Sequence, residues 1–188
     1  MGKKERFISL LNQVEDKGIE RLIDYLENKT DFFIAPASTC YHGNYEGGLL
    51  EHSLNVYDRL KSNIENSDIY NNVPKRTIII TTLLHDLCKI NFYSNIKRWR
   101  KDKHQQWEQY DTYGIDDELP YGHGEKSVFI ITKFITLSTY ESMMIRWHMG
   151  LSEPKENYKY LSKALEKFPL ILALMNADME STYILEKN

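Results

Sequence analysis

Residues 77–89 read TIIITTLLHDLCK, and this stretch decides the fold. Pro74 precedes it and suits the start of a helix, where a prolyl ring is tolerated. The large aliphatic side chains of the stretch would point in all directions around a helix axis. A helix that is apolar on every side lies in the middle of a core. We therefore predict a central buried helix from Pro74 to about Lys89.

The pair His85–Asp86 is an anomaly in this apolar helix. A buried carboxylate that loses its water costs several kcal/mol unless a partner replaces the water. A divalent cation would supply that partner, since imidazole nitrogen and carboxylate oxygen are matched ligands for Zn, Mn, Fe or Ni. Neighbouring side chains on a helix point about 100° apart, so both could reach one ion only near a helix end, where this pair lies.

Apolar residues at helical spacing continue on both sides of the central helix. The expected helices cover residues 7–14, 19–26, 49–64, about 124–135, a segment from Ser138, residues 158–167 and a last helix from Pro169. Ser138 with Glu141 three residues later is a capping-box pattern. Aromatic and charged residues alternate around residues 96–113, which predicts a β-hairpin. We expect an all-α bundle with this hairpin as a small insertion, and residues 1–188 as a single domain.

The composition of the 188 residues is ordinary for a globular protein, with 41% hydrophobic and 27% charged residues. A net charge of -3 gives no basic field over the whole chain, so tracking along nucleic acid is not favoured. Two cysteines, Cys40 and Cys88, are too few for a disulfide framework and indicate reduced thiols. The longest apolar stretch, residues 77–84, is too short to cross a bilayer. We expect a cytoplasmic protein without membrane contact.

Four further polar residues lie on or beside apolar helix faces, or at a helix start, and are candidate ligands. Asp178 falls in line with the apolar side of the last helix, and His52 and His148 lie on or beside the apolar sides of theirs. His123 stands between two glycines where a helix begins. Each alone is also explained by a hydrogen bond to a neighbouring helix. Together with His85–Asp86 they occupy five separate segments, which favours a metal centre.

The order His52, His85–Asp86, Asp178 resembles the H…HD…D signature of the HD superfamily of metal-dependent phosphohydrolases, an all-helical fold. Residues 41–53, YHGNYEGGLLEHS, are similar to the segment before the first ligand in HD domains of bacterial 3'-to-5' exoribonucleases. The sequence HDLCK that begins at His85 matches the HDxxK form. Within this sequence we expect no accompanying nucleic-acid-binding domain, and the GYP elaboration of cyclic-dinucleotide phosphodiesterases is missing.

The resemblance implies one or two divalent ions, drawn from Mn, Fe, Ni, Co, Zn and Mg. The ligands that it implies are His52, His85, Asp86 and Asp178 for a first ion, and Asp86, His123 and His148 for a second. Two ions about 4 Å apart can polarise a phosphoryl group for in-line attack by water. Asp86 and Lys89 are the catalytic candidates: Asp86 would bridge the ions, and Lys89 would neutralise phosphoryl charge or be a solvated residue at a helix end.

Candidate substrate-binding residues lie in two regions. The resemblance to the exoribonuclease segment implies that His42 contacts the substrate. Gly47 and Gly48 could let a phosphate approach the amides at a helix start, although glycines before a helix also form plain loops. Arg98 and Arg100 belong to a basic and aromatic cluster in the hairpin. That cluster could contact phosphate and stack a base, or it could be a solvated surface.

These patterns lead to an expectation about activity. We expect a metal-dependent phosphohydrolase that cleaves a phosphate monoester or diester in a small phosphorylated substrate, a nucleotide above all. One alternative is a nuclease on short single-stranded RNA or DNA that uses the hairpin. Another is a metal-bearing HD fold that senses a ligand without catalysis, since a fold does not fix a function.

Overall fold

The computed structural model describes residues 1–70 and 72–187. The α-helices in these residues are α1 (Lys3–Leu11), α2 (Ile19–Asn28), α3 (Gly48–Glu65), α4 (Lys75–Leu84), α5 (His123–Ile131), α6 (Thr139–Trp147), α7 (Tyr158–Lys167) and α8 (Leu170–Glu180). Short 3-10 helices η1 (Leu87–Lys89), η2 (Gly150–Ser152) and η3 (Lys155–Asn157) and a π-helix η4 (Ser181–Leu185) join or extend them. Strands β1 (Tyr93–Lys101) and β2 (Trp107–Ile115) form an antiparallel hairpin. The prediction of a helix-rich fold with one hairpin is confirmed.

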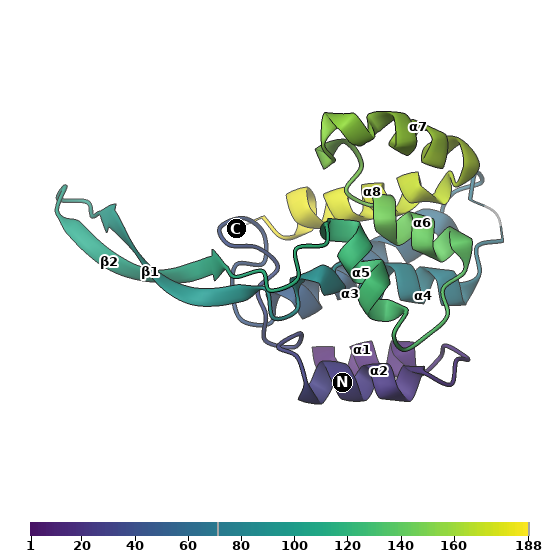
Figure 1. The fold of residues 1–188 in the computed structure, drawn as a ribbon, viewed down its shortest axis with the longest axis horizontal. Helices are drawn as coiled ribbons and strands as arrows, with labels where there is room; N and C mark the ends of the chain where they lie inside the picture. Colours follow the sequence, from purple (N-terminus) through teal and green to yellow (C-terminus); the bar gives the residue numbers. More distant parts are fainter. Residues whose placement is uncertain (71, 188) are drawn as a thin grey trace.

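Helices α3 and α4 form the centre of the helical body. Figure 1 shows them between α1 and α2 on one side and α7 and α8 on the other. Ile79, Ile80, Leu83 and Leu84 of α4 are completely buried, as predicted for a helix that is apolar all round. Helix α3 contributes to two clusters of buried apolar side chains, one shared with α1, α2, α4 and α5, the other with α6, α7 and α8. In the part of the chain that the structure describes, no helix has both the length and the apolar character to cross a bilayer.

Helix α4 ends earlier than predicted. Its last residue is Leu84, and the chain leaves the helix at Asp86, where φ is -102° and ψ is 20°. The amide of Cys88 then donates to the Ser127 hydroxyl of α5 at 3.0 Å, which ties the following turn to a second helix. The predicted continuation of the α-helix to Lys89 was wrong: the Cys88 amide bonds outside the helix, and the amides of Lys89 and Ile90 bond to carbonyls three residues earlier, in the 3-10 turn η1. The turn frees the side chain of Asp86 from the direction that a continuous helix would impose.

Other local predictions agree with the structure. The side chain of Ser138 accepts from the amide of Glu141 at 3.1 Å, and the Glu141 carboxylate accepts from the amide of Ser138 at 2.8 Å. This reciprocal capping box begins α6. Helix α8 begins at Leu170, one residue after Pro169, which was predicted to be its first residue.

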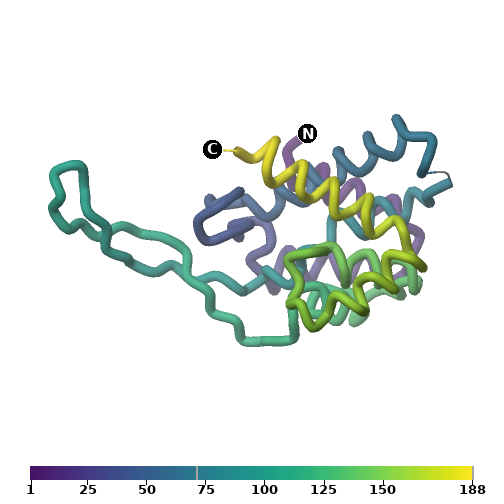
Figure 2. Tube along the Cα trace, turned by 90° about the horizontal axis from the view of Figure 1, so that it is seen from above, coloured from purple at the N-terminus to yellow at the C-terminus, as the bar shows by residue number. Residues whose placement is uncertain are grey.

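The hairpin projects far from the helical body (Figures 1 and 2). Each strand is nine residues long, so the ladder extends beyond the predicted range of 96–113 at both ends. Trp99 and Trp107 are 60% and 65% exposed, respectively. Tyr93 pairs with Ile115 where the hairpin joins the body. Because side chains alternate between the faces of a strand, these four residues share one face.

Candidate metal centre

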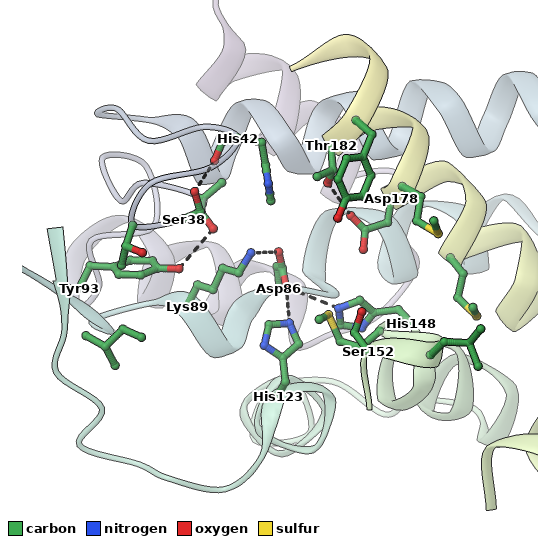
Figure 3. Close-up of a pocket in the computed structure, with 18 residues that line it drawn as sticks. Ser38, His42, Asp86, Lys89, Tyr93, His123, His148, Ser152, Asp178 and Thr182 are labelled. Carbon is green, nitrogen blue, oxygen red and sulfur yellow. Dashed lines mark hydrogen bonds and ion pairs between the residues drawn. The ribbon is translucent and has the colours of Figure 1, made fainter. Parts of the chain in front are cut away.

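The six predicted ligands converge from five segments. They are His52 from α3, His85 and Asp86 from the turn that follows α4, His123 from the start of α5, His148 from the end of α6 and Asp178 from α8. Figure 3 shows several of them around the Asp86 carboxylate. Three of the elements end or begin at the cluster, so the positions of the helix ends define it.

Asp86 is the hub of the cluster and is only 3% exposed. Its Oδ1 lies 2.8 Å from Nε2 of His123 and 3.6 Å from Nε2 of His148. Its Oδ2 lies 2.7 Å from Nζ of Lys89 and 3.5 Å from Nε2 of His85. Burial raises the pKa of Asp86, but the adjacent Lys89 and His85 outweigh it and hold the pKa well below its usual range. The carboxylate is therefore ionised and available to a cation.

His85 and His148 have the same local geometry. Nδ1 of His85 lies 2.7 Å from the carbonyl oxygen of Thr82, and Nδ1 of His148 lies 2.6 Å from that of Ile145. A carbonyl can only accept, so each Nδ1 carries a proton, and in the neutral imidazole each Nε2 then keeps its lone pair. Both Nε2 atoms are buried and have no hydrogen-bond partner among the described residues. Buried polar atoms without a partner call for an explanation, and metal ions bound at these lone pairs would supply one.

His52 lies in a strongly negative environment. Its Nε2 is 3.2 Å from Oδ1 of Asp178 and 3.7 Å from Oδ2 of Asp86, and its Nδ1 is 3.1 Å from Oε2 of Glu186. Burial lowers the pKa of His52, yet the hydrogen bonds to Asp178 and Glu186 raise it to about 9. Burial lowers the pKa of His85 to about 4. The carboxylates around His52 thus favour a positive charge on this ring, or on a cation that replaces its proton, and His85 is neutral, as a metal ligand must be.

Three groups of these side chains have the spacing that a metal ion requires, and two of them fall within the ligand sets predicted for the first and the second ion. In each of them, one ligand atom per residue lies within 4.8 Å of the others. The two groups within the predicted sets are His52, His85 and Asp86, and Asp86, His123 and His148. They share Asp86, and a third group of His85, His148 and Asp178 overlaps both. These buried groups could hold a metal ion.

A cavity of about 410 Å³ opens beside the cluster. Asp86, Lys89, Asp178, His42 and Tyr93 line it, and Figure 3 shows Lys89 and Asp86 near the middle of the view. Both ring nitrogens of His42 are buried and have no hydrogen-bond partner within the described part of the chain. The cavity therefore places an uncommitted imidazole and a lysine beside the cluster.

Gly47 and Gly48 do not line this cavity. The Gly47 amide donates to the Ile34 carbonyl and the Gly48 amide to the Tyr45 carbonyl, each at 3.0 Å. A Cβ on Gly48 would come within 2.0 Å of the Gly43 carbonyl oxygen, so this position needs glycine for packing. The amides of Gly47 and Gly48 thus already have carbonyl partners, and a phosphate contact at this helix start stays a prediction.

Arg98 and Arg100 also lie outside the cavity. Nε of Arg100 donates to Oε1 of Glu108 at 2.7 Å, across the hairpin. The register places both arginines on the hairpin face opposite Tyr93, the strand residue that lines the cavity. A molecule confined to the cavity would not meet them.

Two residues of the site were missed from sequence. Tyr93 lines the cavity, and the carboxylate of Glu186 contacts His52. Eight residues on a regular α-helix would turn Glu186 about 80° away from Asp178. The π-helix η4 changes that angle, since the amide of Glu186 donates to the carbonyl of Ser181, five residues earlier. The sequence carries no signal for this wider turn, so the contact could not be foreseen.

Comparison with known proteins gives one relative of named activity. No family model matches the chain, and no solved structure matches it. The dihydroneopterin 2',3'-cyclic phosphate phosphodiesterase of Methanocaldococcus jannaschii is 31% identical over 126 residues, which cover 60% of this chain and 48% of that protein. The chain thus spans about half the length of this curated relative.

Proposed function

We propose that the chain is an HD-type, metal-dependent phosphohydrolase that cleaves a phosphodiester in a small phosphorylated molecule, preferably a nucleotide. The observation that carries the proposal is the pair of buried, unpartnered Nε2 atoms of His85 and His148 beside the ionised Asp86. The similarity to a protein named as a cyclic phosphate phosphodiesterase supports a diester over a monoester. We also propose that residues 1–188 act as one domain, since α3 takes part in both apolar clusters.

The ligand sets follow from the groups described above. A first divalent ion would be held by His52, His85, Asp86 and Asp178, and a second by Asp86, His123 and His148. Mixed imidazole and carboxylate ligands suit Mn, Fe, Ni, Co and Zn, and Mg is the least suited to them. When bound, such ions polarise a phosphoryl group and lower the pKa of water, which is the chemistry that hydrolysis needs.

Residues of the chain itself would bind and orient the substrate. Lys89 points its ammonium group at the Asp86 carboxylate and lines the cavity, so it can neutralise charge on a phosphoryl oxygen. His42 presents two uncommitted ring nitrogens from the same wall and is the proposed substrate contact. Tyr93 and Ile115 extend the lining toward the hairpin. The volume suits a ligand of nucleotide size.

A substrate panel tests the proposal. The wild-type protein would be loaded in turn with Mn, Ni, Co and Mg and assayed on mononucleotides, cyclic nucleotides and short oligonucleotides. We expect hydrolysis of at least one phosphodiester, its loss on chelation and its return with metal. Asp58→Asn, which changes an exposed carboxylate of α3 paired with Arg6, serves as the control and should keep full activity. Metal binding without hydrolysis of any member would favour the sensor alternative and sink the enzymatic assignment.

The hairpin favours a second candidate, a nuclease on short single-stranded RNA or DNA. Its exposed Trp99 and Trp107 share a face with Tyr93 at the cavity, so bases leaving the cavity could stack along that face. Lys97 and Lys101 lie on the same face and could contact phosphates. Short oligonucleotides in the panel separate the two candidates. A nuclease should cleave short oligonucleotides faster than cyclic mononucleotides.

A further inference from the structure

His52 differs from the other buried histidines in the acceptor that its Nδ1 finds. His85 and His148 directly follow the last residues of α4 and α6, where a carbonyl three residues earlier is free to accept from Nδ1. Their orientation is thus fixed by their own helices. His52 has no such acceptor, because it lies inside α3, which continues to Glu65. The carbonyls of the preceding turn accept helical amides there.

The acceptor for His52 comes from the opposite end of the chain. Nδ1 of His52 lies 3.1 Å from both carboxylate oxygens of Glu186, whose side chain is 4% exposed. Asn55, three residues beyond His52 on α3, donates from Nδ2 to Oε1 of Glu186 at 2.9 Å. The π-helix η4 directs Glu186 toward this point, as described above. Glu186 is therefore held from two sides.

We propose that Glu186 is the positioning residue of the metal centre: it fixes the proton of His52 on Nδ1 and keeps the Nε2 lone pair toward Asp86 and Asp178. This inference rests on the proposed function. Partners of this kind orient a metal-bound histidine and raise its basicity. Glu186 lies outside the HD-type ligand set, and its contact with the centre passes through the imidazole of His52.

A direct ligand role for Glu186 is the competing explanation. His42, His52 and Glu186 also have ligand atoms within 4.8 Å of one another. In the structure Nε2 of His52 lies 3.2 Å from a carboxylate oxygen of Asp178, which can only accept. An ion shared by His52 and Asp178 would replace the proton on Nε2, because a neutral imidazole has one lone pair to offer it. Nδ1 then carries the proton and donates to Glu186. The two explanations differ in stoichiometry, since only a direct ligand would bring an additional ion.

The test compares Glu186→Gln with Glu180→Gln. Glu180 is a matched control, because its carboxylate also joins the C-terminal helix to α3, through Arg59 and Asn63, but contacts no histidine. Zinc affinity would be measured by competition with a chromophoric chelator, stoichiometry by elemental analysis, and the tautomer of His52 by nitrogen-15 NMR of the zinc-loaded protein. We expect Glu186→Gln to lower the affinity for the first zinc ion about 10- to 100-fold without changing the number of ions bound. Glu180→Gln should bind zinc as the wild type does.

Three outcomes would overturn the inference. Wild-type zinc affinity and an unchanged His52 tautomer in Glu186→Gln would show that His52 needs no positioning residue. A stoichiometry lower by one ion would make Glu186 a direct ligand. Equal losses of affinity in both variants would indicate a general effect of the joint between α8 and α3. If the wild-type protein binds no metal at all, the proposed function itself fails, and this result is distinct from the other three.

Discussion

Asp86 concentrates the chemistry of the site in one side chain. Its two oxygens lie within 4 Å of a lysine and of four imidazoles, and both proposed ions would use it. Asp86→Asn keeps the shape of the side chain and removes its charge. We expect phosphodiester hydrolysis to fall by more than about 100-fold, since loss of an orienting partner alone already costs up to that factor. Steady-state rates and metal content of Asp86→Asn, measured with Asp58→Asn as the control variant, check this prediction. A variant with near-normal turnover would exclude Asp86 as the bridge.

His123 and His148 separate a two-ion centre from a one-ion centre. Both face Oδ1 of Asp86, whereas His52 and His85 face Oδ2. His123→Ala and His148→Ala should therefore release one ion of two and leave the other bound. His123 is the cleaner position, because its side chain is 32% exposed and its removal leaves little buried space. Elemental analysis after desalting gives the count. Two retained ions with full activity in both variants would leave only a one-ion site.

The residues of the site differ in how far the sequence could predict them. The sequence pattern puts His85, Asp86 and Asp178 on apolar helix faces, where a polar side chain needs a partner, and the structure does place the three together. For Gly47 and Gly48 the sequence does not show what the structure does, that their amides already have carbonyl partners. The ligand roles themselves remain proposals that the variants above would test.

At the scale of the elements, helix ends decide the geometry. The pattern of aliphatic residues predicted the central helix, and burial of α4 confirms it, but the pattern continues through Leu87 and hides the end at Leu84. That end depends on the hydrogen bond from Cys88 to Ser127, a contact between segments far apart in sequence. Periodicity reports which face is buried. It carries no information on contacts of this kind.

The hairpin offers a test at the same scale, because its two faces serve as controls for each other. We expect Arg98→Gln with Arg100→Gln to leave the Michaelis constant of a cyclic mononucleotide unchanged, since neither arginine lines the cavity. Trp99→Ala with Trp107→Ala, on the face continuous with Tyr93, should raise the Michaelis constant of a short oligonucleotide more than it lowers turnover, as loss of uniform binding does. Stacking losses of about 1–3 kcal/mol per base correspond to roughly 5- to 150-fold.

Kinetics on both substrates at two salt concentrations complete this test. If the arginines contact the backbone of an oligonucleotide, their replacement should flatten the salt dependence for that substrate alone, because fewer counterions are released. Unchanged Michaelis constants in both double variants would make the hairpin a solvated surface without a role in substrate binding.

At the scale of the whole molecule, the candidate centre draws on helices of both apolar clusters. The candidate ligands come from α3, α5 and α8 and from the ends of α4 and α6, so an ion there would connect both core clusters. The order of histidine and aspartate residues along the chain let the sequence predict which five segments contribute to the centre. Their arrangement in space required the structure, because no local pattern specifies which helices pack together.

Metal binding should therefore stabilise the whole fold. A ligand that binds only the native state at about 100 times its dissociation constant adds about 2.7 kcal/mol. For a chain of this size each kcal/mol raises the melting temperature by about 2–4 °C, so we expect a shift of roughly 5–11 °C between chelated and metal-loaded protein. Differential scanning calorimetry at several metal concentrations measures it. Asp86→Asn should show little or none of the shift, because it removes the ligand common to both ions. A wild-type protein that melts at the same temperature with and without the metals that support hydrolysis would mean that the centre does not join these helices through an ion.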